Sequence, residues 1–147
     1  MQQEGSWAAT AARLQSIKGI GLLTAAWLLV TTLNFTACAT PTAATAYAGL
    51  APHLRQSGTS VRRRSSIGHT GNGRLRTALY LATLSAARYN PLIKPFYERL
   101  RAAGKPEKVA RCAAALKLLH LAWAVATKDQ DFDPDYQISR VRSRAVA

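Results

Sequence analysis

One polar segment in the middle of the chain limits how the rest can fold. Residues 50–76 read LAPHLRQSGTSVRRRSSIGHTGNGRLR and contain six arginines, two histidines, four glycines and four serines, with no carboxylate. So much glycine and charge excludes a packed helix over most of this stretch. Thr59, Val61, Ser65 and Ile67 allow a short hairpin within it. We therefore expect a compact, mostly α-helical domain with one long basic Gly/Ser loop.

The carboxylates are distributed unevenly along the chain. Its 147 residues carry 20 Lys and Arg against 7 Asp and Glu, a net charge of +13, and no carboxylate occurs from Gly5 to Tyr97. Unneutralised positive charge over such a span repels itself, and a polyanion relieves the repulsion while releasing its counterions. Nucleic acid is the leading partner class, and an anionic membrane surface is the alternative. The same span excludes an active site of paired carboxylates or a two-metal nuclease from this part of the chain.

The remaining acidic residues and the cysteines do not predict a metal site. The run Asp129–Asp135 has the spacing of a calcium loop, but Pro134 stands where the turn glycine belongs and no closing Glu follows. We interpret the run as a solvated acidic end. Cys38 and Cys112 are far apart, without a metal-site partner at short spacing, and are interpreted as small buried hydrophobes. No cofactor is expected in this chain.

Residues 19–52 lack charge, which raises the question of a membrane span. The apolar run GIGLLTAAWLLVTTL is shorter than the roughly 20 residues that a spanning helix needs. Polar residues and Pro41 follow it, which favours two packed helices over insertion and leaves a membrane location as a minor alternative. The first residues lack the basic and apolar regions of a signal peptide.

Periodicity and capping residues predict five helices between the breaks. They are expected at about residues 22–32, 42–48 and 72–89, over LIKPFYERLRAAG up to Gly104, and from Pro106 to about Lys128. Thr40 and Gly49 are expected as the two caps of the second helix. The apolar stripe of the third helix is Leu75, Ala78, Leu79, Ala82 and Ala86, and that of the last is Val109, Ala113, Leu116, Leu119 and Trp123, with His120 beside it as a packing residue.

A glycine turn precedes the first of these helices. In Ile17–Ala25, IKGIGLLTA, Gly19 and Gly21 suit the turn of a helix-hairpin-helix element, and Lys18 adds a cation. Bare backbone N–H groups at such a helix start can hold a phosphate without reading base sequence. The alternative is that the two glycines simply join two packed helices.

The arginines predict phosphate contacts. Arg62, Arg63 and Arg64 are consecutive and cannot share one face, which suits a run that wraps a polyanion backbone. Arg74 and Arg76 begin the following helix, where cations oppose the helix dipole and an anionic ligand would offset the cost. The alternative, a merely solvated face, is weakened because no acid lies nearby in the sequence.

The role of the serines in the basic segment, residues 50–76, cannot be assigned from their residue type alone. A loop serine is usually a turn or capping residue, and a nucleophilic serine needs a base, a metal or a dense positive field. His53 and His69 are candidate bases, but nothing in the sequence places them beside a serine. The four serines are Ser57, Ser60, Ser65 and Ser66.

Five stretches in order carry a family resemblance: IKGIGLLTAAWLL, YAGLAPHLRQSGT, IGHTGNGRLRTALYLATLSAAR, FYERLRAAGKPEKVARCAAALKLLHLAWAV and FDP. Together they resemble the C-terminal transposase domain of the IS-one-ten (IS-one-sixteen) family of insertion-sequence transposases, the bridge-RNA-guided serine recombinases. The resemblance covers about residues 16–134. It implies a leader or linker remnant over 1–15, the transposase C-terminal (serine) domain over 16–134, and a basic tail over 135–147.

The resemblance also implies a chemistry. Family members carry an N-terminal RuvC-like domain with four acidic metal-binding residues, a coiled-coil linker, and then this domain. The serine of the Ser-Gly pair after GLAP, here Ser57, is the implied nucleophile toward a DNA 5′ phosphate, with Arg55, Arg62, Arg63 and Arg64 neutralising charge near it. The implied partners are DNA, guide RNA and further copies of the chain in the prokaryotic cytoplasm, at the nucleoid. Mg²⁺ is implied only with the RuvC-like half.

Three departures from the family pattern are evident. Lys18 replaces the usual proline before the Gly-Ile-Gly turn, and His69 and Thr70 replace a common basic pair. The RuvC-like half has no counterpart in the sequence, so the chain resembles a truncated or split transposase, inactive alone. A nucleic-acid-binding module without chemistry is the alternative function.

Overall fold

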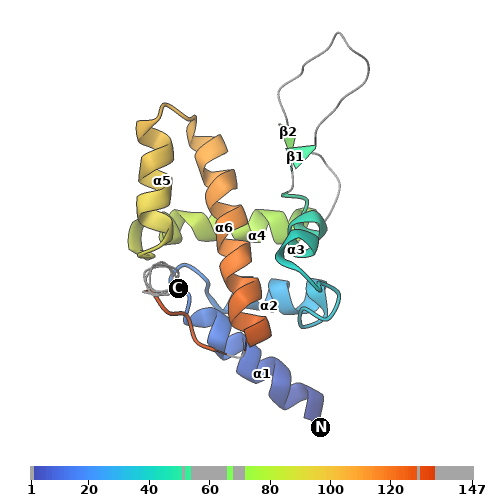
Figure 1. Cartoon of the computed structure of the whole chain (residues 1–147). Helices are drawn as coiled ribbons and strands as arrows, with labels where there is room; N and C mark the ends of the chain where they lie inside the picture. Colours follow the sequence, from blue (N-terminus) through green and yellow to red (C-terminus); the bar gives the residue numbers. More distant parts are fainter. Residues whose placement is uncertain (1, 51, 54–65, 68–71, 129, 135–147) are drawn as a thin grey trace, which may run out of the picture.

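The computed structural model describes residues 2–50, 52–53, 66–67, 72–128 and 130–134. The mostly α fold predicted from the sequence is confirmed, and the one sheet in these described residues has two short strands. Figure 1 shows the arrangement. The elements are α1 (Gln2–Gln15), α2 (Leu22–Thr32), α3 (Pro41–Ala48), β1 (Pro52–His53), β2 (Ser66–Ile67), α4 (Gly73–Tyr89), α5 (Ile93–Ala102) and α6 (Glu107–Lys128).

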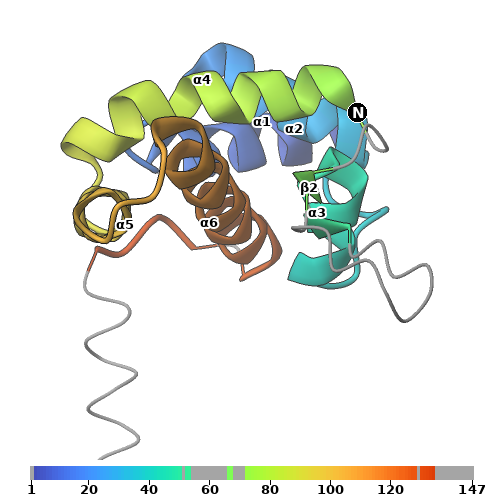
Figure 2. The same cartoon turned by 90° about the horizontal axis from the view of Figure 1, so that it is seen from above.

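Helix α6 is the centre of the fold. It packs against α1, α3, α4 and α5. Seen from above, α4 crosses one side of α6, while α5 and α3 flank it (Figure 2). Small side chains dominate the buried surface of α6, which lets the neighbouring helices approach closely. The buried residues are Ala110, Ala114, Ala115, Leu118, Leu119, Ala122 and Val125.

The apolar stripe predicted for α6 is confirmed in part. Leu119 is buried, Leu116 and Trp123 are half-buried and pack against the core, Ala113 is half-buried, and Val109 is 50% exposed. The reason is that α6 has neighbours on several sides, so apolar residues occur around most of its circumference and the 3.6-residue period does not locate the buried centre.

Helix α6 also meets the length and composition criteria for a membrane span. Its most apolar window has a mean hydropathy of 1.5, and 39% of that window is buried inside the fold. Because four other helices pack against α6, we interpret it as the core helix of this domain.

Helices α2 and α3 confirm the two packed helices predicted over the uncharged stretch. Thr40 caps α3, with its Oγ1 accepting a hydrogen bond from the Ala43 N–H at 3.1 Å. Gly49 ends α3 in the left-handed conformation with φ of 69°. The turn between the helices is fixed to α6, because the Trp123 Nε1–H donates to the Cys38 carbonyl at 3.0 Å. Both cysteines are free thiols, and Cys38 is buried as predicted.

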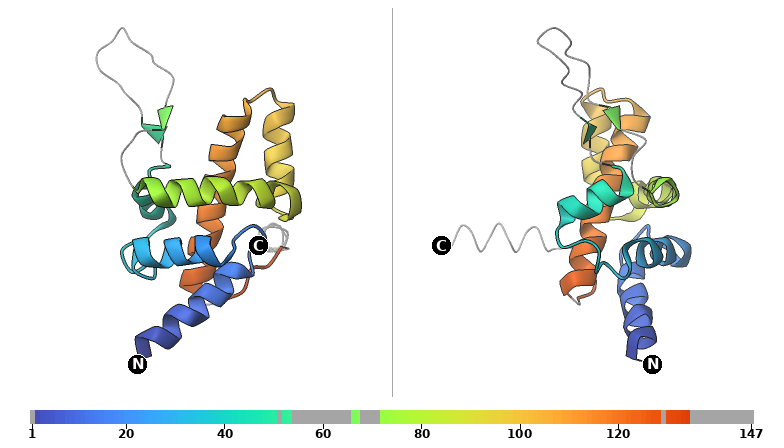
Figure 3. Two further views of the ribbon diagram at one scale, coloured as in Figure 1. Left: turned by 180° about the vertical axis from the view of Figure 1, so that it is seen from behind. Right: turned by 90° about the vertical axis from the view of Figure 1, so that its right-hand side faces the viewer.

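Helix α4 follows its predicted range and stripe closely. Leu75, Leu79, Ala82 and Ala86 are all buried, and Ala78 is half-buried. Figure 3 shows α4 running beside α2, with α1 beyond them. Residues 2–15, assigned to a leader or linker remnant, form α1, whose Leu14 is fully buried and whose Trp7 packs against the core.

Candidate nucleic-acid interface

The basic segment leaves the helical core where α3 ends and returns where α4 begins. The N–H of Leu50 donates to the Thr45 carbonyl at 3.1 Å, which finishes the α3 cap. The N–H of Asn72 donates to the Tyr47 carbonyl at 2.9 Å. This second bond joins the residue before α4 to the last turn of α3, so both ends of the segment are held at one place.

Two short strands, β1 and β2, pair within the basic segment. β1 and β2 are antiparallel, with Pro52 opposite Ile67 and His53 opposite Ser66. Of the four residues on which the predicted hairpin rests, only Ile67 is described, and it lies in β2. Other predicted residues lie outside the described ones: Arg55, Ser57, Thr59, Ser60, Val61, Arg62, Arg63, Arg64, Ser65, His69 and Thr70.

The start of α4 has a capped backbone and no acidic residue. Asn72 Oδ1 accepts hydrogen bonds from the N–H groups of Arg74 and Leu75, both at 3.1 Å. The first turn of α4 carries no Asp or Glu. Cations therefore lie at the positive end of the helix dipole without a local carboxylate, as predicted, and an anion bound there would be favoured.

Arg74 borders an open groove between α2 and α4. Its guanidinium carbon lies 5.8 Å from the centroid of the Trp27 ring. Leu23 and Leu81 in the groove are 73% and 56% exposed. A cation, an indole, hydroxyls and apolar walls suit a nucleic-acid strand, whose phosphates contact cations and whose bases contact apolar rings. The groove is lined by residues that include Leu23, Thr24, Trp27, Arg74, Thr77 and Leu81.

Arg76 has different neighbours from Arg74. Arg76 is half-buried, and its positive charge acts on Cys112 of α6. Burial raises the pKa of the Cys112 thiol, and the charge of Arg76 lowers it in part. Of the two arginines predicted as a phosphate-binding pair, Arg74 lines the groove, and phosphate contact by Arg76 stays a prediction.

The glycine turn before α2 is packed against α4. Gly19 has φ of +109°, and a Cβ added to it would lie 2.5 Å from the Ala86 Cβ. Gly21 is the N-cap of α2, and a Cβ there would have no atom within 4 Å. Packing therefore explains Gly19, which agrees with the alternative that the glycines join two helices. Lys18 and Gly21 are exposed, and phosphate binding by this turn stays a prediction.

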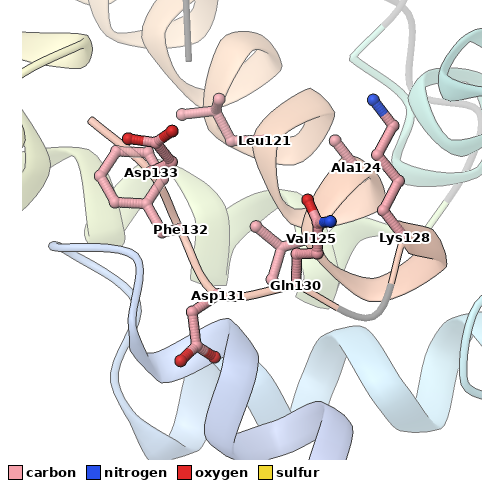
Figure 4. A pocket seen from close by; sticks show the side chains of 8 residues that line it. All are labelled: Leu121, Ala124, Val125, Lys128, Gln130, Asp131, Phe132 and Asp133. Atoms are coloured by element: carbon pink, nitrogen blue, oxygen red, sulfur yellow. The ribbon is translucent and has the colours of Figure 1, made fainter. Parts of the chain in front are cut away.

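The acidic end after α6 folds back onto the core (Figure 4). Phe132 packs against the core, and its N–H donates to Ser16 Oγ at 2.9 Å. Asp131 and Asp133, on either side of Phe132, are exposed. The three residues line a small cavity of about 80 Å³ with the C-terminal turns of α6. The FDP motif thus anchors this segment between α6 and the turn after α1.

The described residues do not fit a metal ion. They contain no group of three or more His, Cys, Asp or Glu side chains placed to share one. We therefore derive no reaction step through Mg²⁺ at these residues.

Comparison with known proteins identifies the family. Residues 11–98 match the model of the Transposase IS116/IS110/IS902 family. The chain belongs to this transposase family. The matched residues run from α1 into α5 and include the whole basic segment.

Curated relatives of the transposase family extend the match. The chain is 37% identical over 125 residues to the pilin gene-inverting proteins of Moraxella lacunata and Moraxella bovis. It is 34% identical over 112 residues to the insertion element IS110 uncharacterized 43.6 kDa protein of Streptomyces coelicolor. These alignments cover 84% and 76% of the chain but only 38% and 27% of the relatives. The chain thus spans well under half the length of these relatives.

Proposed function

We propose that this chain is the serine-bearing domain of a DNA transposase and that Ser57 is its nucleophile. The observation that carries the proposal is the family match over residues 11–98, which contains GLAPHLRQSG at residues 49–58. The described geometry supports it indirectly, because the bond between Asn72 and Tyr47 holds both ends of the segment that includes Ser57.

The proposed step is a transesterification. Ser57 Oγ attacks the phosphorus of a DNA phosphodiester, the new Oγ–P bond forms as the bond to the 3′ oxygen breaks, and the serine proton passes to the leaving 3′ hydroxyl. The product is a 5′ phosphate joined to Ser57, and the reverse step rejoins a strand without net hydrolysis. Arginines of the basic segment would stabilise charge on the phosphate as it is attacked.

The partners in this proposal are DNA and guide RNA, bound largely through their backbones. The candidate contacts are Lys18, Gly21 and Arg74 beside the arginines of the basic segment. Assembly with further copies, and complementation by a RuvC-like half that supplies acidic residues and Mg²⁺, belong to the same proposal.

The experiment combines the chain with a separately produced RuvC-like half and a suicide DNA substrate. We expect a covalent protein–DNA species only in the combined reaction, and Ser57→Ala should abolish it while DNA binding persists. Ser60→Ala is the matched control and should retain the adduct. A combined reaction in which no adduct forms, despite DNA binding, would contradict the proposal.

That last outcome favours a second function, a nucleic-acid-binding module without chemistry. The observation in its favour is the net charge of +13, which suits binding to a polyanion whether or not Ser57 reacts. Both functions require binding that weakens with salt: for about six phosphate contacts, the slope of log K against log salt should be roughly −5 on duplex DNA.

A further inference from the structure

Two cations from different helices meet at one aromatic ring, away from the basic segment. α5 and α6 run side by side (Figure 1). The Nζ of Lys117, from α6, lies 4.5 Å from the centroid of the Phe96 ring, and the guanidinium carbon of Arg99, from α5, lies 5.5 Å from it. The ring face attracts cations electrostatically, and the charge of Arg99 also acts on Lys117.

Neither of these cations is neutralised by the described part of the chain. Glu107 of α6 forms an ion pair with Arg111 of the same helix, at 3.0 Å. Lys117 and Arg99 have no carboxylate within 4 Å among the described residues. Burial, and then the charge of Arg99, lower the pKa of Lys117. The fold thus keeps a partly desolvated cation beside another cation, an arrangement that an anion between them would relieve.

We propose that Phe96, Arg99 and Lys117 form a second nucleic-acid contact, a site for a backbone phosphodiester. The guanidinium fork can donate two hydrogen bonds to phosphate oxygens, and the ammonium adds a point charge. The inference rests on the proposed function, since that function supplies the nucleic acid, but it adds a surface on α5 and α6.

The test compares two double variants that lose the same charge. Arg99→Gln with Lys117→Gln removes the site, and Arg101→Gln with Lys108→Gln is the control. Arg101 is two residues from Arg99 on α5, and Lys108 is nine residues from Lys117 on α6. At about 100° per residue, both control positions lie on the opposite sides of their helices from the site. General electrostatic effects are therefore similar in the two variants.

Affinity is measured by fluorescence anisotropy over a salt series for duplex DNA and for single-stranded RNA. For duplex DNA the site variant should lose about one phosphate contact, so its salt slope should become less negative by roughly 0.9, or by roughly 0.7 on single-stranded RNA. The control should change the slope less. The arm that shows the larger loss identifies DNA or RNA as the source of the phosphodiester.

A wild-type chain that binds nucleic acid, with equal slopes for the two variants, would overturn the site and leave the proposed function intact. A wild-type chain that binds no nucleic acid would overturn the proposed function itself. Selective loss of polyglutamate binding in the site variant, without loss of nucleic-acid binding, would also overturn the site.

Thermal melting checks the fold of each variant. If the double variant unfolds, Lys117→Gln alone decides, with a slope change of the same sign that reaches at most roughly 0.9 on duplex DNA, and Lys117→Arg should restore the slope.

Discussion

Asn90 and Lys18, 72 positions apart in sequence, are joined by a hydrogen bond from the Asn90 Nδ2 to the Lys18 carbonyl at 2.9 Å. The Asn90 Oδ1 also accepts from the N–H of Leu92 at 2.9 Å and of Ile93 at 3.2 Å. Asn90 is fully buried. One amide therefore links the turn before α2 to the junction of α4 and α5, and fixes where Lys18 is presented.

Replacing Asn90 by Ala should destabilise the domain. The Lys18 carbonyl and two N–H groups would lose their partners in or near the core, so we expect a loss of about 1–3 kcal/mol in the free energy of unfolding, measured by urea denaturation. Gln15→Ala is the control, because the Nε2 of the exposed Gln15 donates to the Ala11 carbonyl of its own helix at 3.3 Å. Equal effects of the two substitutions would show that Asn90 does not join these elements.

The two glycines of the turn should respond differently to serine. Gly19→Ser forces a side chain into the left-handed region and against Ala86, so we expect a loss of at least about 2 kcal/mol in unfolding free energy. Gly21→Ser places a favoured N-cap residue in open space and should change stability by less than about 0.5 kcal/mol.

The contact with Ala86 can be separated from the backbone strain. Ala86→Gly combined with Gly19→Ser should lose less stability than the sum of the two single substitutions, because the contact between the two Cβ atoms is removed, while the contacts with the Ala86 Cα at 2.9 Å and N at 3.0 Å and the backbone strain persist. Strict additivity would mean that Gly19 and Ala86 do not touch.

His120 should make stability depend on pH. Thr45 Oγ1 donates to the Pro41 carbonyl at 3.0 Å, which leaves its lone pairs to accept from His120 Nε2–H, 2.8 Å away. His120 is exposed by its surface area, but partial desolvation beside Thr45 lowers its pKa below 6.5. The unfolded chain therefore takes up a proton first as pH falls, so the contribution of His120 is full above about pH 6.5 and is lost as pH drops through the folded pKa.

An NMR titration of the His120 ring checks this sign. We expect its midpoint below 6.5 in the folded chain, and His120→Gln should flatten the decline of melting temperature toward acid pH. A midpoint above 6.5 would mean that the protonated ring is stabilised instead.

Arg74 and Arg76 should separate binding from folding. Arg74→Ala removes an exposed cation from the groove, so it should weaken binding evenly across DNA sequences. The stabilising free energy of its cation–π contact with Trp27 and the unfavourable free energy of its position in the helix dipole are similar in magnitude. The free energy of unfolding should therefore change by less than about 0.5 kcal/mol. Arg76→Ala, at a half-buried position, should instead lower the melting temperature and should reduce DNA affinity less than Arg74→Ala does. The reverse pattern would assign phosphate contact to Arg76.

Helix positions followed from the sequence wherever local chemistry decides them. Thr40 and Gly49 carry the caps of α3, and the stripe from Leu75 to Ala86 lies on the buried side of α4. These features depend on residues within a few positions of each other, so capping rules and the 3.6-residue period are sufficient to predict them.

Contacts between distant helices did not follow from the sequence. The buried side of α6 depends on where four other helices lie, and the meeting of Lys117 with Phe96 depends on how α5 folds back along α6. The i, i+3 spacing of Phe96 and Arg99 was the one local sign of that site. Likewise, the packing role of Gly19 is evident only from its neighbour Ala86 on α4.

The most direct test of the proposed nucleophile is peptide mapping of the covalent protein–DNA adduct by mass spectrometry. The adduct formed with the RuvC-like half is digested, and the residue that carries the nucleotide phosphate is located. We expect the phosphate on Ser57. A phosphate on Ser60, Ser65 or Ser66 would contradict the assignment of the nucleophile.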